Sequence, residues 1–189
     1  MRDGEPDEQL AGRAAAGDRQ ALETLLHRHA DRIHAICRRI LGHREDALDA
    51  TQEAMIAVTR GIRRFDGRSA FTTWLYRVAT NAALDEGRRK ARRPHPVETR
   101  AETPGTGSVE DAVGARIDVD AALRDLPEEF RVAVVLRDLC DLDYAEIADL
   151  LRVPAGTVRS RIARGRAALA DALGNPETTG DRPTPETRP

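Results

Sequence analysis

The chain has 189 residues, of which 33% are charged, 40% hydrophobic and only 3% aromatic. This length fits one large domain or two small ones, and the apolar share is enough for compact cores. No apolar run approaches the roughly 20 residues of a membrane helix, and the polar start MRDGEPDEQL has no secretory hydrophobic region. We therefore expect a cytoplasmic protein without membrane insertion.

Cys37 and Cys140 are the only thiols of the chain. Two isolated thiols make neither a disulfide framework nor a thiolate zinc site, so we expect both to pack in the core. The sequence also has no P-loop, no nucleophile–base pair and no carboxylate cluster with a metal-ligating histidine. We expect no enzyme activity, no catalytic residue, no metal and no cofactor.

The formal net charge is only -2, but the sign of the charge alternates along the chain. Residues 60–100 contain eleven basic and four acidic residues, whereas residues 101–149 contain four basic and thirteen acidic ones. Five arginines and no acid follow between 152 and 166. A single basic run is usually a solvated helix face, but two separated basic blocks on predicted helices favour nucleic-acid binding.

Residues 7–92 form the first of two blocks in which apolar residues recur with helical spacing. A second helix is predicted around 47–58 and a third over 71–92. Gly42 is predicted to end the first helix, whose stripe consists of Leu22, Leu25, Leu26, His29, Ile33, Ile36, Cys37, Ile40 and Leu41.

The third predicted helix combines aromatic and basic residues. Such a combination suits bases unstacked from a duplex, since rings stack on bases and guanidinium groups hold phosphates. Core packing is the plainer interpretation of Phe71 and Trp74. One arc of the helical wheel is predicted to be buried: Leu75, Val78, Ala79 and Ala82. The opposite arc is predicted to be exposed: Arg77, Thr80, Asn81, Leu84 and Arg88.

Asp49, Gln52 and Glu53 share one face of the middle helix at i, i+3 and i+4. A divalent metal is poorly supported there because neither a histidine nor a second carboxylate helix accompanies the face. A protein partner with a basic surface is the better interpretation.

Two segments are predicted to lie outside packed structure. Residues 93–115 are rich in proline, glycine and serine, and they predict a flexible linker. The tail 174–189 is rich in proline, threonine and glutamate, which predicts disorder. The second helical block then covers 116–173, and the fold class is all-α, with two small helical domains joined by a linker.

The second block contains a predicted helix-turn-helix. Asp143 and Glu146 have the spacing of a capping box, and Arg152-Val153-Pro154 ends the short helix that they begin. The next helix turns Val158, Ile162 and Leu169 toward the core, and the opposite side carries Arg159, Ser160, Arg161, Ala163 and Arg164. Outward arginine and serine residues suit contacts to guanine and phosphate. An ordinary antiparallel helix pair with a basic side is the alternative.

Pro127 is predicted to begin an upstream helix, with Glu128 and Glu129 in its first turn, where the helix dipole favours acids. Arg137 lies near the end of that helix. It is expected either to reach the DNA backbone or to complement the helix dipole.

Together these motifs resemble those of the small, extracytoplasmic-function class of bacterial sigma-70-type initiation factors, which consist of region 2 and region 4. The resemblance is carried by DALDATQEAM, FDGRSAFTTWLYRVATN, LPEEFRVAVVLRDL and VPAGTVRSRIARGR, in this order along the chain. It implies that 7–92 is region 2 and that 116–173 is region 4.

The resemblance also implies roles for named residues and partners. Core RNA polymerase is the implied main partner, through its largest-subunit coiled coil and its flap, and promoter DNA and an anti-sigma protein are implied as well. The residues implied to dock on the coiled coil are Asp49, Gln52 and Glu53. Those implied at the -10 element are Gly61, Phe65, Arg77, Val78, Asn81 and Arg88. Those implied at the -35 element are Arg137, Arg159, Ser160, Arg161 and Arg164.

Two basic modules on one tether bind two sites cooperatively, although each module alone binds weakly. We therefore expect tight promoter binding only once polymerase orients both domains. The alternatives are a stand-alone DNA-binding regulator that uses the first block for dimerisation, and, with less support, a nucleic-acid enzyme.

Overall fold

The computed structural model describes residues 4–92 and 112–174, with side chains from residue 119 onward in the second range. Across these ranges the chain is helical and has no strand, so the predicted all-α class is confirmed. In chain order the elements are α1 (Asp7–Ala15), α2 (Arg19–Leu41), α3 (Arg44–Gly61), η1 (Ile62–Arg64), α4 (Phe71–Arg92), α5 (Ala112–Asp125), α6 (Glu128–Val134), η2 (Val135–Leu139), α7 (Tyr144–Leu151) and α8 (Ala155–Ala172).

The first helical group comprises α1 to α4 with η1, and its core is a three-way packing of α2, α3 and α4. The side chain of Asp18 begins α2 by accepting from the backbone N–H groups of Gln20 and Ala21. Gly42 ends α2 in the left-handed conformation, with φ of 75°, which glycine adopts without steric cost. The predicted helix and its end are confirmed.

The sequence did not predict α1 as a separate helix. Its nine residues bury Leu10, Ala11 and Ala14. Asp7 also fixes α1 to α2, because its Oδ2 lies 2.8 Å from Nε2 of the buried His29. A helix this short has little periodicity of its own and owes its stability to such tertiary contacts.

The third predicted helix is confirmed as α4, but the predicted exposure of its polar arc is wrong at Thr80. This side chain is fully buried. The reason is that α4 packs on both α2 and α3, so its buried arc is wider than that of a helix with one neighbour. Leu75 and Ala79 are buried as predicted, and Asn81 and Arg88 are exposed.

The second helical group comprises α5 to α8 with η2. A π-helical turn follows α6, in which the N–H of Cys140 donates to the carbonyl of Val135 (3.1 Å). Asp141 then adopts a left-handed conformation with φ of 54°, which aspartate tolerates better than most residues. This irregular turn sets the direction from which the chain enters α7.

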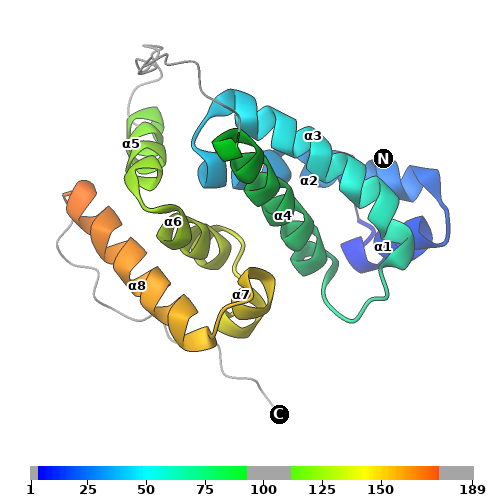
Figure 1. Cartoon of the computed structure of the whole chain (residues 1–189). Helices are drawn as coiled ribbons and strands as arrows, with labels where there is room; N and C mark the ends of the chain where they lie inside the picture. The colour runs from blue at the N-terminus through cyan, green and yellow to red at the C-terminus, as the bar shows by residue number, and fades with distance from the viewer. Residues whose placement is uncertain (1–3, 93–111, 175–189) are drawn as a thin grey trace.

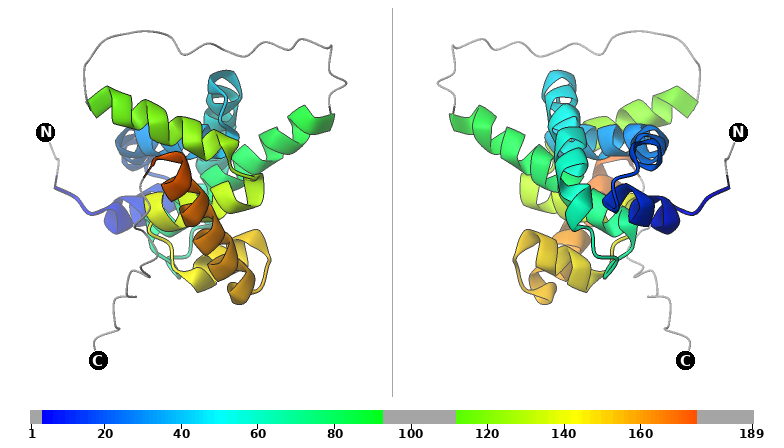
Figure 2. Two further views of the ribbon diagram at one scale, coloured as in Figure 1. Left: turned by 90° about the vertical axis from the view of Figure 1, so that its left-hand side faces the viewer. Right: turned by 90° about the vertical axis from the view of Figure 1, so that its right-hand side faces the viewer.

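The two helical groups lie side by side (Figure 1), and the views turned by 90° agree (Figure 2). Contacts join α2 to α5, α6 and η2. The predicted linker and tail fall largely on residues 93–111 and 175–189, which lie outside the described residues.

Candidate nucleic-acid interface

The solvent-facing side of α3 carries the predicted polymerase-docking residues. Asp49, Gln52 and Glu53 are all exposed. On the same side Leu48 and Ile56 keep 46% and 43% of their surface exposed. Exposed apolar side chains grouped on one face are a feature of protein-binding surfaces. The buried side of α3 is built from alanines and Val58, which lets α3 pack closely against its neighbours.

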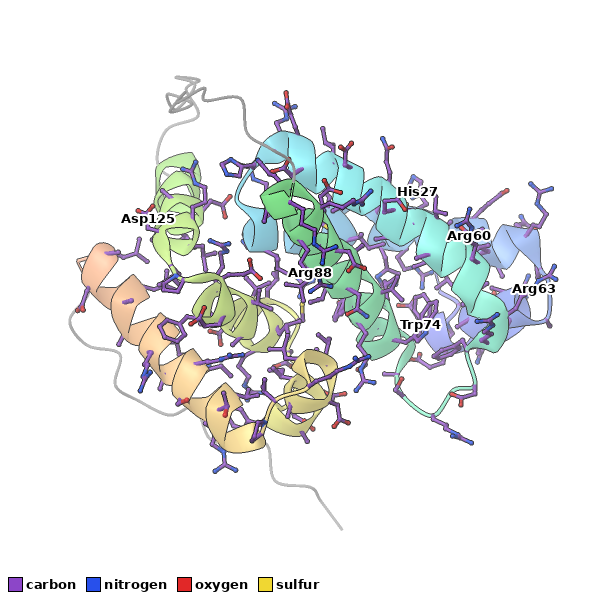
Figure 3. All side chains as sticks on the ribbon, viewed as in Figure 1. His27, Arg60, Arg63, Trp74, Arg88 and Asp125 are labelled. Atoms are coloured by element: carbon purple, nitrogen blue, oxygen red, sulfur yellow. The ribbon has the colours of Figure 1, made fainter. Side chains whose placement is uncertain are left out.

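Three aromatic rings pack together where α3 meets α4. The ring of Phe65 lies 5.9 Å from that of Phe71 and 5.6 Å from that of Trp74, between centroids. Phe71 is buried, whereas Phe65 and Trp74 are half-buried (Figure 3 labels Trp74). Gly61 is part of this contact, because a Cβ built there would lie 3.2 Å from Cζ2 of Trp74.

A pocket of about 300 Å³ opens between α3 and α4. Val78 and Asn81, both predicted at the -10 element, line it, and so does Glu53 from the α3 face. Its polar lining comes from an amide and several charged groups, which gives both hydrogen-bond donors and acceptors. Gly61 and Phe65 do not line this pocket: they belong to the aromatic contact with Trp74.

The two predicted arginines of α4 are both engaged by carboxylates. Nη2 of Arg88 donates to Oδ1 of Asp85 at 2.5 Å, and both side chains are more than half exposed. Nη2 of Arg77 lies 3.9 Å from Oδ2 of Asp149, which belongs to α7 of the other helical group. The Nε atom of Arg77 is buried without a hydrogen-bond partner within the described structure.

The predicted helix-turn-helix is confirmed as α7 and α8. Both halves of the capping box are present, with Asp143 Oδ1 accepting from Glu146 N–H (2.8 Å) and Glu146 Oε2 accepting from Asp143 N–H (2.9 Å). Arg152 ends α7 with φ of 54°, and α8 begins directly after Pro154. A short helix, a tight turn and a second helix packed on the first are the parts of a helix-turn-helix.

The outward side of α8 carries the predicted -35 residues. Arg159, Ser160 and Arg164 are exposed and Arg161 is half-buried. The opposite side is buried at Val158, Ile162 and Gly165. Gly165 permits a close approach of α8 to α6, because a Cβ there would lie 2.6 Å from Cγ2 of Val134. The donors of α8 are therefore held on a rigid helix and left open to a ligand.

Arg137 contacts the protein itself. Its Nη1 donates to the carbonyl of Leu142 (2.9 Å), and its guanidinium lies 5.2 Å from the centre of the Tyr144 ring. The guanidinium of Arg159 lies 5.8 Å from the same ring. The sequence did not identify Tyr144 as a partner of these two arginines. The available indication was its position as the first residue of α7, directly after the capping residue Asp143.

Two features are absent from the parts of the chain that the structure describes. No group of three or more histidine, cysteine or acidic side chains gathers there in metal-binding geometry. Among the same residues, no helix has the length and hydropathy needed to cross a bilayer.

Comparison with known families agrees with this geometry. The family model of Sigma-70 region 2 matches residues 25–93, and that of Sigma-70, region 4 matches residues 116–169. The chain is 40% identical to the ECF RNA polymerase sigma factor SigE of Mycolicibacterium smegmatis, over 89% of this chain and 70% of that protein. It is 35% identical to the RNA polymerase sigma-H factor of Pseudomonas aeruginosa, over 89% of this chain and 94% of that protein.

A solved structure, that of CnrH in complex with the cytosolic domain of CnrY, is similar in fold. Its TM-score is 0.64 at 26% identity, covering 89% of this chain and 97% of that chain. Family models and relatives therefore match both helical groups, in the same order along the chain. The chain belongs to the sigma-70 family, as an extracytoplasmic-function (ECF) sigma factor that acts in transcription initiation.

Proposed function

We propose that this sigma factor binds core RNA polymerase and directs initiation at promoters whose -35 and -10 elements it recognises with α8 and α4. The observation that carries the proposal is the outward side of α8, where arginine and serine donors stand exposed on a capped helix-turn-helix. A helix of this kind enters the major groove, where each base pair presents a distinct set of donors and acceptors.

At the -35 element, Arg159 and Arg164 have the reach and the paired donors to bind guanine O6 and N7 or a phosphate. Ser160 supports a shorter contact to a base or the backbone, although its Oγ also donates to the carbonyl of Thr157 (2.9 Å). Arg161 is half-buried, so a backbone phosphate beside the groove suits it better than a base edge. Arg137 uses one of its five donors on Leu142, which leaves others for a phosphate.

At the -10 element, the pocket between α3 and α4 is the proposed site of an unstacked non-template base. Asn81 offers an amide that both donates and accepts, and Val78 offers an apolar wall. Gly61 and Phe65 shape the neighbouring aromatic contact, and the half-buried Phe65 is proposed to stack on the unstacked base. Arg77 and Arg88 are proposed to exchange their carboxylate partners for DNA phosphates.

The outer face of α3 is proposed to dock on the coiled coil of the largest polymerase subunit. Asp49, Gln52 and Glu53 supply charge and hydrogen bonds, and the exposed Leu48 and Ile56 supply apolar area. This composition is that of a contact with a partly basic partner. It differs from the continuous apolar stripe that a dimerising regulator needs. The family resemblance adds the polymerase flap and an anti-sigma protein as partners.

Run-off transcription with bacterial core polymerase, on a library of genomic fragments, tests the proposal. New discrete start sites should appear when the protein is added. They should be lost in Asn81→Ala and Arg164→Ala and kept in Arg19→Ala, which changes an exposed arginine away from the proposed contacts. Absence of new starts, with DNA footprinting by the protein alone, would instead support the stand-alone regulator.

A further inference from the structure

Tyr144, the first residue of α7, lies against two arginines that come from other elements. The guanidinium carbon of Arg137, in η2, lies 5.2 Å from the centre of the Tyr144 ring, and that of Arg159, in α8, lies 5.8 Å from it. Both distances are within the roughly 6 Å over which a ring attracts a cation. The two helices of the motif pack on each other (Figure 1), and the ring joins them at the proposed base reader Arg159.

The position of this ring is fixed by contacts before and after it in the chain. Before it, Nη1 of Arg137 donates to the carbonyl of Leu142 (2.9 Å), and the N–H of Leu142 donates to the carbonyl of Leu136 (3.2 Å). After it, Asp143 and Glu146 form the capping box that begins α7. The ring itself is half-buried and packs against the buried apolar core. A flexible side chain that lies against such a fixed ring is restricted as well.

Three arginines of α8 differ in how they are held. Arg166 is bound through its N–H groups, with Nε 3.2 Å and Nη2 2.6 Å from the carboxylate oxygens of Asp138. Arg159 lies against the Tyr144 ring, and a ring contact leaves the N–H donors of the guanidinium for other partners. Arg164 is exposed, and among the residues that the structure describes it has neither an ion pair nor a ring contact. Of these three, Arg159 combines a restraint with available donors.

A restrained arginine is better suited to read a base than an unrestrained one. An arginine side chain loses much of its rotamer entropy when a ligand fixes it, and an existing restraint removes part of that loss before binding. A guanine edge also requires two N–H groups in one geometry. An orientation that is set beforehand therefore favours the base pair that fits it over those that do not.

We propose that Tyr144 is a positioning residue for -35 recognition. Its ring holds Arg159 in the orientation that reads a base and holds Arg137 beside it for a neighbouring phosphate. This assignment rests on the proposed function of α8. It makes Tyr144 a determinant of specificity at the one base pair that Arg159 reads.

A role in packing alone predicts a different result. Loss of a packing residue destabilises the helix-turn-helix as a whole and weakens binding to every DNA sequence alike. Loss of a positioning residue lowers the discrimination at one base pair and leaves the other base pairs unchanged. The two roles are therefore separated by measuring specificity and not affinity alone.

Side-chain NMR of the full-length free chain tests the restraint without DNA or polymerase. The Nε–Hε signal of Arg159, assigned by its loss in Arg159→Lys, should show a ring-current shift and a higher order parameter than the signal of Arg164. Tyr144→Phe keeps the ring and should preserve both properties. Tyr144→Leu keeps an apolar side chain but no ring, and should remove the shift and lower the order parameter to that of Arg164. An Arg159 signal unchanged in Tyr144→Leu would overturn the proposal.

Binding of the holoenzyme to promoter fragments with single -35 base changes tests the effect on specificity. The base pair whose discrimination is lost in Arg159→Ala is assigned to Arg159. Tyr144→Leu should lower the discrimination at this base pair about two- to fivefold, the factor of one exposed contact between a cation and a ring, and leave the other base pairs unchanged. Tyr144→Phe should behave like the wild type. Thermal unfolding followed by circular dichroism checks that both variants are folded at the assay temperature.

A double substitution separates positioning from an independent effect. Tyr144→Leu should change nothing further in an Arg159→Ala background, because the positioned group is already gone, whereas in an Arg164→Ala background it should have its full effect. Equal losses at all base pairs in Tyr144→Leu would overturn the proposal. Equal losses in Tyr144→Leu and Tyr144→Phe would do so too, and so would uniform weakening in Arg159→Ala.

The same binding data distinguish a failure of this proposal from a failure of the proposed function. If the wild type discriminates among -35 sequences and Tyr144→Leu discriminates equally well, the positioning role is wrong and the proposed function stands. If the wild-type holoenzyme shows no -35 preference, the proposed function is wrong, and the role of Tyr144 in specificity is wrong with it.

Discussion

The two helices proposed to contact DNA differ in how available they are. On α8, Arg159 and Arg164 are exposed, and among the residues that the structure describes neither forms an ion pair with a carboxylate. On α4, Arg77 lies 3.9 Å from Asp149 of α7, and Arg88 is paired with Asp85. Similar basic helices are therefore not equally available for DNA binding. These two arginines of α8, proposed to read the -35 element, are already free of such pairs in the described structure, whereas those of α4, proposed to hold the -10 element, must first give up their carboxylate partners.

The largest predicted effect is a loss of stability at high pH, caused by the buried thiol in each helical group. Both pKa values are raised by burial from 9.0, to about 11 at Cys37 and about 12 at Cys140. Below about pH 8 both thiols are protonated in the folded and the unfolded chain, so they add no pH dependence there. Above pH 9 the unfolded chain releases these protons first, and stability falls as pH rises toward the folded values.

Between pH 8 and pH 10 each thiol should cost about 1.4 kcal/mol of unfolding free energy, or about 3 kcal/mol together. Urea unfolding at a series of pH values measures this loss. Cys37→Ala with Cys140→Ala provides the control, because its stability should vary less with pH. An equal slope in the wild type and the control would contradict the prediction.

The next largest effect is expected from an added methyl group at Gly165, where α8 packs closely against α6. Gly165→Ala adds a methyl group 2.6 Å from Val134 Cγ2 and should cost about 1–3 kcal/mol despite the better helix propensity of alanine. Gly156→Ala is the matched control on the same helix, since nothing lies within 4 Å of its added Cβ. It should be neutral or slightly stabilising. Thermal unfolding separates the two, and equal melting temperatures would show that α8 has room to move.

Removal of a base-reading side chain should weaken promoter recognition without affecting the fold. Arg164→Ala should cost about 1–3 kcal/mol of discrimination at one -35 base pair, because that is the contribution of a bidentate arginine contact. Holoenzyme binding to promoter fragments with single base changes measures it. Uniform weakening on every sequence would assign Arg164 to a phosphate instead.

The smallest predicted effect concerns the ion pair between Asp149 of α7 and Arg77 of α4. Asp149 is 79% exposed, so its pair with Arg77 should contribute at most about 1 kcal/mol. Asp149→Ala should therefore raise the affinity of the free chain for a single-stranded -10 oligonucleotide by about fivefold or less. Asp171→Ala removes an exposed acid elsewhere, at the end of α8, and corrects for the lost charge. Equal gains in affinity in both variants would mean that the net charge of the chain, and not the pair between Asp149 and Arg77, limits binding.

Sequence patterns that involve only neighbouring residues predicted much of the fold. Gly42, Asp143 and Pro154 act as the capping and breaking residues that their positions indicated, because such effects depend on a few neighbouring residues. The burial of Thr80 was mispredicted, since a helical wheel does not say how many neighbours a helix has.

The site was predicted in part. The exposure of the named residues of α8 and α3 follows from the spacing of apolar residues along each helix, which is again a local property of the sequence. The contacts of Arg32 and Arg131 with distant carbonyls could not be foreseen, because the partners lie 107 and 91 residues away in sequence and meet only through the packing of the two helical groups. The π-helical turn after α6 was missed for a similar reason, since tertiary packing and not propensity selects it.

Footprinting of one promoter by the free chain and by the holoenzyme, at the same salt concentration, tests the difference between α8 and α4 most directly. We predict that the free chain protects the -35 element weakly and leaves the -10 element unprotected, and that the holoenzyme protects both. Strong and equal protection of both elements by the free chain at physiological salt would contradict it.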